Sequence, residues 1–127
     1  MKGLFDNHNH SQFSFDGKKT TVESSALAAK EKGLGGICFS DHCDFYVPPM
    51  KASFEDLVPE HFDITQQQAE IDRIRALTGD RFKILKGIEI GMYDECRDQI
   101  RKVLSDNTFD QIIASVHYIE QTDPYYG

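Results

Sequence analysis

The sequence lacks the features that mark secreted, membrane-spanning and nucleic-acid-binding proteins. Its 127 residues contain no apolar run that approaches the ~20 residues needed to cross a bilayer, and no basic segment followed by an apolar core at the start. A net charge of -7 argues against a surface that grips nucleic acid through its phosphates. A chain of this length, 39% hydrophobic and 28% charged, predicts one ordinary globular domain.

Cysteine is scarce. Only Cys38, Cys43 and Cys96 are present, the count is odd, and no Cys-x-x-Cys pair occurs, so we expect reduced thiols in a cytoplasmic protein. Cys38 lies in an apolar run and is expected in the core. Cys43 follows His42 and can be read as a group that approaches a metal or as a small buried residue, and we favour the second interpretation.

A pair of histidines near the amino terminus is the most informative feature of what the sequence does contain. His8 and His10 follow a short apolar segment, and residues two apart on a strand point to the same face, which also includes Asp6. Paired imidazoles at a fixed separation can share one metal ion. Asp16 follows in a turn closed by Gly17 and can return a carboxylate to the same place. The alternative is two solvated polar residues at the end of a strand.

The rest of the sequence alternates between short apolar runs and amphipathic stretches. Strands are predicted at residues 3–8, 35–40, 82–89 and 111–116, and helices at 22–32, 64–77 and 94–104, with a further short helix near 54–57. The helix at 64–77 is predicted to be amphipathic, with Ala69, Ile71, Ile74 and Leu77 on or near one apolar stripe. Strand and helix in alternation predict an α/β fold with parallel strands.

Each of the four predicted strands ends in a residue that can bind a metal ion. The strands end at His8 and His10, at His42, at Glu89 and at His117. Each residue taken singly can be a solvated strand end or a satisfied core histidine. In β/α barrels, however, the chemistry gathers at the carboxyl ends of the strands. The same placement at four strand ends therefore favours a metal centre.

Four neighbouring residues have less certain roles. Asp6 and Asp41 could orient ligating imidazoles, or could make ordinary strand-end and turn hydrogen bonds. Asp44 could support a metal ligand from behind or be a plain loop residue, and we favour the loop. His61 is expected to be exposed to solvent.

Several blocks of sequence together resemble the PHP (polymerase and histidinol phosphatase) superfamily. They are Asp6-Asn7-His8-Asn9-His10, Ser14-Phe15-Asp16-Gly17, Gly33-Leu34, Phe39-Ser40-Asp41-His42, Gly87-Ile88-Glu89 and Ser115-Val116-His117-Tyr118-Ile119. The similarity extends over essentially the whole chain. It implies a distorted (β/α)7 TIM-like barrel that holds up to three divalent metal ions, with zinc favoured and iron or manganese as alternatives.

The resemblance also implies a role for each candidate ligand. His8 and His10 would bind one metal ion, and Glu89 would bridge it to a second ion that His117 also binds. Asp16 and His42 would bind the third ion. The last two blocks look most like the histidinol-phosphate phosphatase branch. The implied activity is hydrolysis of a small phosphorylated substrate, L-histidinol phosphate, to L-histidinol and phosphate.

Two other functions are compatible with the same sequence features. The chain can be another PHP phosphoesterase that acts on nucleotides or small phosphate esters, or a PHP module that binds metal without catalysis. Family members are also longer, and their second half supplies further ligands and basic residues. We therefore expect residues 1–127 to be the amino-terminal half of one PHP domain, with six candidate ligands. Such a chain would be a fragment, an inactive remnant, or a subunit completed by self-association or by another chain.

Overall fold

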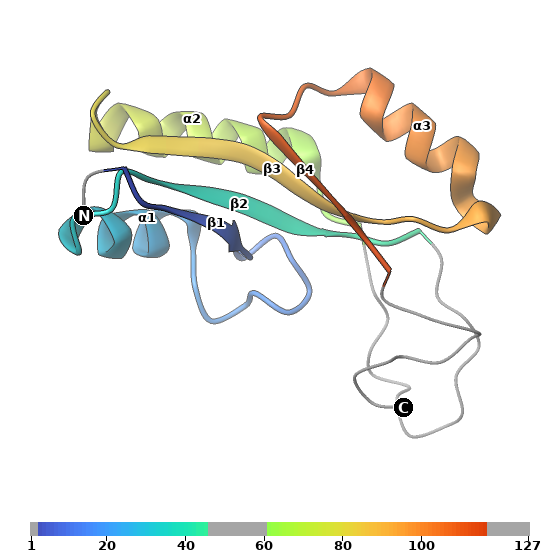
Figure 1. The fold of residues 1–127 in the computed structure, drawn as a ribbon, viewed down its shortest axis with the longest axis horizontal. Helices are drawn as coiled ribbons and strands as arrows, with labels where there is room; N and C mark the ends of the chain where they lie inside the picture. The colour runs from blue at the N-terminus through green and yellow to red at the C-terminus, as the bar shows by residue number, and fades with distance from the viewer. Residues whose placement is uncertain (1–2, 46–60, 117–127) are drawn as a thin grey trace.

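The computed structural model describes residues 3–45 and 61–116 of the chain. Two sequence predictions, the short helix near residues 54–57 and the position of His117, lie outside these ranges. The described residues contain one sheet of four parallel strands in the order β1-β2-β3-β4 (Figure 1). The strands are β1 (Phe5–Asn9), β2 (Gly36–Cys43), β3 (Lys83–Gly91) and β4 (Gln111–Ser115).

Helices connect the strands, as the alternating pattern predicts. They are α1 (Val22–Glu31), α2 (Ile64–Thr78) and α3 (Arg97–Asp106), the last preceded by a single 3-10 turn, η2 (Asp94–Cys96). Thr21 caps α1 by accepting a hydrogen bond from the Ser24 amide, and the Ser24 hydroxyl accepts one from the Thr21 amide in return. Gly33, with φ +80°, follows the end of α1. Four parallel strands with intervening helices form a curled half-barrel, which confirms the predicted fold class.

The apolar core lies between the sheet and the helices. One cluster joins α1, β2, α2 and β3 through Val22, Ala26, Ala29, Ile37, Phe39, Ile71, Ile74, Phe82 and Ile84. A second cluster contains Cys43, Phe62, Ile88, Ile90, Cys96 and Ile100. Side chains alternate between the two faces of a strand. Because Cys43 and Ile88 face the helices, the adjacent His42 and Glu89 point to the opposite, concave face of the sheet.

The buried face of α2 differs from the predicted stripe. Ile71 and Ile74 are fully buried as expected, but Leu77 is 59% exposed and Ala69 is exposed. The buried stripe instead contains Gln67 and Thr78. The prediction was wrong because it assigned the inward positions by hydrophobicity, and two of these positions are occupied by polar residues whose side chains are hydrogen-bonded.

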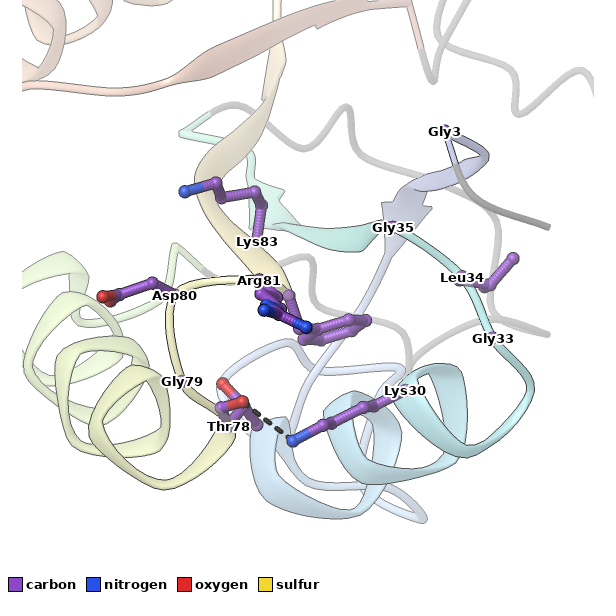
Figure 2. Close-up of a pocket in the computed structure, with 11 residues that line it drawn as sticks. Gly3, Lys30, Gly33, Leu34, Gly35, Thr78, Gly79, Asp80, Arg81 and Lys83 are labelled. Carbon is purple, nitrogen blue, oxygen red and sulfur yellow. Dashed lines mark hydrogen bonds between the residues drawn. The ribbon is translucent and has the colours of Figure 1, made fainter.

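A hollow lies at the end of the sheet where β2 and β3 begin (Figure 2). Its lining includes Gly35, Arg81 and Lys83, and Lys30 at its rim donates a hydrogen bond to the Thr78 carbonyl. The predicted site residues do not line it. Within residues 3–45 and 61–116, no helix is both long and apolar enough to cross a membrane.

Candidate metal centre

Three neighbouring strands deliver imidazole and carboxylate groups to one end of the sheet. His8 lies near the end of β1, His42 near the end of β2 and Glu89 near the end of β3. His42 and Glu89 are register partners, so their side chains project from the same face side by side. His10 directly follows the end of β1 at Asn9. The structure therefore brings together four of the predicted site residues at one sheet edge.

The first group of donor atoms surrounds the Glu89 carboxylate. Oε2 of Glu89 lies 2.8 Å from Nε2 of His8 and 2.8 Å from Nε2 of His10, and the two imidazole nitrogens are 3.2 Å apart. Zinc bound tetrahedrally at about 2.0–2.1 Å separates its ligand atoms by roughly 3.3 Å. The nitrogens of His8 and His10 already have this spacing. Glu89 is 5% exposed, and the Ser115 hydroxyl of β4 donates a hydrogen bond to its other oxygen, Oε1.

The second group contains His10, Asp16 and His42. Nδ1 of His10 lies 2.9 Å from Oδ2 of Asp16, and Nε2 of His42 lies 3.0 Å from the same oxygen. One donor atom of each residue lies within 4.8 Å of the others, as in the first group. His10 belongs to both groups, with Nε2 directed to Glu89 and Nδ1 directed to Asp16. The two candidate sites therefore share one side chain.

A tight turn after β1 returns Asp16 to the strand ends. The turn contains backbone hydrogen bonds from the Ser14 amide to the Ser11 carbonyl and from the Gly17 amide to the Ser14 carbonyl. A Cβ atom at Gly17 would overlap the Ser11 carbonyl, so this approach requires glycine. The Ser14 hydroxyl donates to Asp16 Oδ1 and accepts from the His42 amide. Ser14 therefore holds Asp16 against the end of β2.

The electrostatics of the two groups favour positive charge between their side chains. Burial alone would lower the pKa of His10, but the carboxylates of Asp16 and Glu89 outweigh it and raise the pKa from 6.5 to about 9. Burial opposes ionisation of Asp16, yet hydrogen bonds from His10, His42 and Ser14 hold its pKa well below the ordinary range. For His42, burial is likewise outweighed, here by Asp16 and Asp44, and its pKa is raised. The clustered carboxylates thus stabilise positive charge at this place.

The structure shows where the four residues with several possible roles lie. Asp41 is fully buried and bonds to Ser11 and Gln67, which is the turn-type hydrogen bonding left open above. Asp44 is not a plain loop residue, because its side chain is 1% exposed and lies 3.5 Å from Nδ1 of His42. Asp6 is exposed, and so is His61 as predicted.

Cys43 is a small buried residue, in agreement with the favoured interpretation. It is fully buried in the apolar cluster with Phe62 and Ile88. Burial, reinforced by the charge of Asp44, raises the pKa of its thiol to about 12. A thiol with this pKa is protonated at neutral pH and is a poor metal ligand.

Sequence reasoning assigned no role to three residues that hold the candidate ligands or the residues beside them. Ser14, Ser115 and Gln67 contact Asp16, Glu89 and Asp41 respectively. The only signal for Gln67 was its spacing, because it precedes Ile71 and Ile74 by four and seven residues and so shares their helix face. Ser115 lies one strand over from Glu89, and this proximity follows only from the sheet order.

A half-barrel of parallel strands with histidine and carboxylate groups at its carboxyl edge defines the class of β/α metal-site proteins. The family model for the PHP domain matches residues 6–127, and the chain belongs to this family. The chain is 37% identical to a histidinol-phosphatase of Lactococcus lactis over 127 residues, which are all of this chain and 44% of the relative. It is 33% identical to a probable histidinol-phosphatase of Clostridium acetobutylicum, covering 96% of this chain and 42% of the relative.

A solved structure agrees with these sequence matches. The crystal structure of the Lactococcus lactis histidinol phosphate phosphatase, in complex with zinc, L-histidinol and phosphate, superposes with a TM-score of 0.81 at 30% identity. The match covers 97% of this chain and 43% of that one. The chain therefore spans less than half the length of the relatives that it matches. The barrel expected from the sequence is the fold of this neighbour.

Proposed function

We propose that this chain is the metal-binding part of a phosphomonoester hydrolase that acts on L-histidinol phosphate. One observation carries the proposal: five donor side chains from three strands and one turn converge on the two groups that share His10. The relatives named as histidinol-phosphatases, and the zinc, L-histidinol and phosphate in the solved neighbour, support the substrate. Because the chain spans less than half of these relatives, hydrolysis of the substrate is proposed for the complete protein.

The proposed ligands are His8, His10, Asp16, His42 and Glu89, together with His117, which lies outside the described residues. His8 and His10 would hold one divalent ion, and Glu89 would join it to a second that also takes His117. Asp16 and His42 would hold a third ion. The close approach of His10 to Asp16 supports neighbouring sites: an imidazole bound through Nε2 would keep its N–H on Nδ1 and donate it to the Asp16 carboxylate. Imidazole and carboxylate donors suit zinc, iron and manganese.

Divalent ions in such a site supply an activated water as nucleophile and neutralise the charge of the phosphate. The contribution of the protein is to hold the donors in place. Glu89 is buried, and the Ser115 hydroxyl fixes one of its oxygens while the other faces the imidazoles. Asp16 is held in the same way by Ser14. These hydrogen bonds limit the rotation of each carboxylate and so set the spacing of the ions that it would contact.

Elemental analysis and a substrate panel test the proposal. The chain, together with the further chain or partner that completes the barrel, is stripped with a chelator and reloaded with Zn²⁺ or Mn²⁺. It is then assayed with L-histidinol phosphate beside a nucleoside monophosphate and a simple sugar phosphate. We expect bound metal and turnover that favours L-histidinol phosphate. Glu89→Ala should lose metal and turnover, whereas the exposed-pair variant Glu70→Ala should retain both.

The possible results separate the rival functions. Full metal content and turnover in Glu89→Ala would contradict the proposed site. Metal binding without hydrolysis of any ester would point to a non-catalytic module, and a preference for the nucleotide would point to another phosphoesterase of the family.

The proposal extends to the domain organisation and the location of the protein. We propose that residues 1–127 correspond to the amino-terminal half of a single PHP domain, with the missing barrel strands supplied by further chain or by a partner subunit. The 43% coverage of the solved neighbour supports this. We also propose a cytoplasmic location, which the free thiols of Cys38, Cys43 and Cys96 support.

A further inference from the structure

We propose that Gln67, on the outer helix α2, is a positioning residue for the metal centre. Through the buried carboxylate of Asp41 it holds Ser11, and thereby the turn between His10 and Asp16. The inference rests on the proposed function, since it assumes that these two side chains bind metal.

Gln67 occupies a position where an apolar residue would ordinarily lie. Its side chain is fully buried on the same face of α2 as Ile71 and Ile74. Nε2 donates to Oδ2 of Asp41 at 2.9 Å and lies 3.3 Å from the carbonyl oxygens of Phe39 and Gly87. The two N–H groups of this nitrogen can serve Asp41 and one of the two carbonyls, which orients Nε2 towards the strands. Gln67 therefore connects α2 with β2 and β3 at one point.

Asp41 is the next link from the helix to the site. Its carboxylate is fully buried and accepts hydrogen bonds from the amide and the hydroxyl of Ser11 as well as from Gln67. A buried carboxylate is stable only when donors satisfy it. Loss of the Gln67 donor would leave the Oδ2 atom with the Ser11 hydroxyl alone, so the position of Ser11 depends on Gln67.

Ser11 begins the turn that carries the candidate ligands. It directly follows His10 in the chain, is fully buried, and its carbonyl accepts the hydrogen bond that starts the turn at Ser14. Ser14 in turn fixes Asp16 and the backbone of His42. A displacement of Ser11 therefore changes the spacing of His10 and Asp16 together, although Gln67 touches neither.

A purely structural role predicts a different response to substitution. Methionine has nearly the same length as glutamine and packs well among Ile71 and Ile74, so a packing role would survive the change. A positioning role would not survive, because methionine cannot donate a hydrogen bond to Asp41. Gln68 provides a matched control. It is the next residue of α2, is half-buried, and donates one hydrogen bond to the Thr108 carbonyl, away from Asp41.

The experiment compares wild type, Gln67→Met and Gln68→Met in the intact chain. Zinc affinity is measured by competition with a chromophoric chelator, and the absorption spectrum of bound Co²⁺ reports the ligand geometry. Gln67→Met should weaken zinc binding by up to about 10-fold, the lower end of the range for direct partners of a metal ligand, because Gln67 acts through Asp41 and Ser11. It should also alter the Co²⁺ spectrum. Gln68→Met should match wild type in both.

A double-mutant cycle keeps the test decisive if Gln67→Met folds poorly. Ser11→Ala removes one of the hydrogen bonds to Asp41 and should also weaken zinc binding. Its effect should be non-additive with Gln67→Leu, a second apolar variant that has no hydrogen-bond donor, and additive with Gln68→Met. Wild-type zinc affinity and Co²⁺ spectrum in both Gln67 variants would overturn the inference while leaving the proposed function intact. Absence of zinc binding in wild type itself would overturn both.

Discussion

His42 and Asp44 form a buried imidazole–carboxylate pair at the carboxyl end of β2. Nδ1 of His42 lies 3.5 Å from Oδ2 of Asp44, whose side chain is 1% exposed. Nε2 of the same ring lies 3.0 Å from Asp16. Nδ1 also lies 3.8 Å from Oε2 of Glu89, slightly further than from Asp44. A carboxylate beside the second nitrogen is the usual arrangement for orienting a ligating histidine.

Removal of the Asp44 charge should weaken zinc binding without unfolding the protein. Asp44→Asn keeps the size of the side chain but no longer stabilises the N–H of the His42 ring as a carboxylate does. Zinc affinity, measured by calorimetric titration, should fall about 10- to 100-fold. Asp94→Asn is the control, because Asp94 pairs with Arg97 on the exposed start of α3. Equal affinities in the two variants would argue against an orienting role for Asp44.

Gly91 should be intolerant of any side chain. A Cβ atom there would overlap the Asp44 carboxylate and lie 2.6 Å from the Tyr93 ring. Gly91→Ala should destabilise the fold by about 1–3 kcal/mol in urea denaturation and should also reduce zinc affinity. The affinity is the informative measurement, because it tests whether Asp44 moves. A loss of stability with wild-type zinc affinity would mean that the overlap is relieved elsewhere.

The metal-free protein should lose stability as the pH rises through about 9. The pKa of folded-state His10 is raised from 6.5 to about 9, because Asp16 and Glu89 outweigh the effect of burial. The contribution of its protonation is therefore fully present below about pH 6.5 and lost above about pH 9. The measurement is the difference in free energy of unfolding between wild type and His10→Gln in a chelator, from about pH 6 to pH 10.

A variant that changes no ionisable group provides the control for this pH dependence. Gln68→Met leaves every titrating side chain in place, so its difference from wild type should stay nearly constant over the same range. A difference for His10→Gln that is equally flat would show that its protonation is not coupled to folding. The same raised pKa predicts that zinc binding at pH 7 releases protons, since a ligating imidazole must be neutral.

The buried face of α2 predicts which of its apolar residues stabilise the fold. Ile71 is fully buried in the cluster with α1, whereas Leu77 is 59% exposed. Ile71→Ala should reduce the free energy of unfolding by about 2–5 kcal/mol, and Leu77→Ala by about 0.5 kcal/mol or less. Denaturation in urea measures both. Similar losses of stability in the two variants would mean that Leu77 faces the core, as the sequence predicted.

Strand ends were predictable because two independent patterns coincide there. The apolar runs before His42 and Glu89 locate the strands, and the parallel arrangement places their ends at one edge. The fold class and the meeting of His8, His10, His42 and Glu89 follow from these two facts. Neither pattern depends on the details of side-chain packing.

The residues behind the ligands were not predictable in the same way. A polar residue on a helix is ordinarily assigned to the solvent face, which hides the burial of Gln67. Asp44 follows the end of β2 and resembles a loop residue until its approach to His42 is known. Their roles come from three-dimensional contacts between elements far apart in the sequence, and hydrophobic periodicity does not encode such contacts.

The first strand would gain structural support from the proposed metal centre. In β1 every residue except Asn9 is exposed, so little apolar packing secures it beyond its pairing with β2. His8 nonetheless reaches Glu89, 81 residues further along the chain and two strands away. An ion shared by these side chains would act as a removable cross-link over the intervening strand. Chelation should therefore release the amino-terminal edge of the sheet first, detectable as faster amide hydrogen exchange there than in β3.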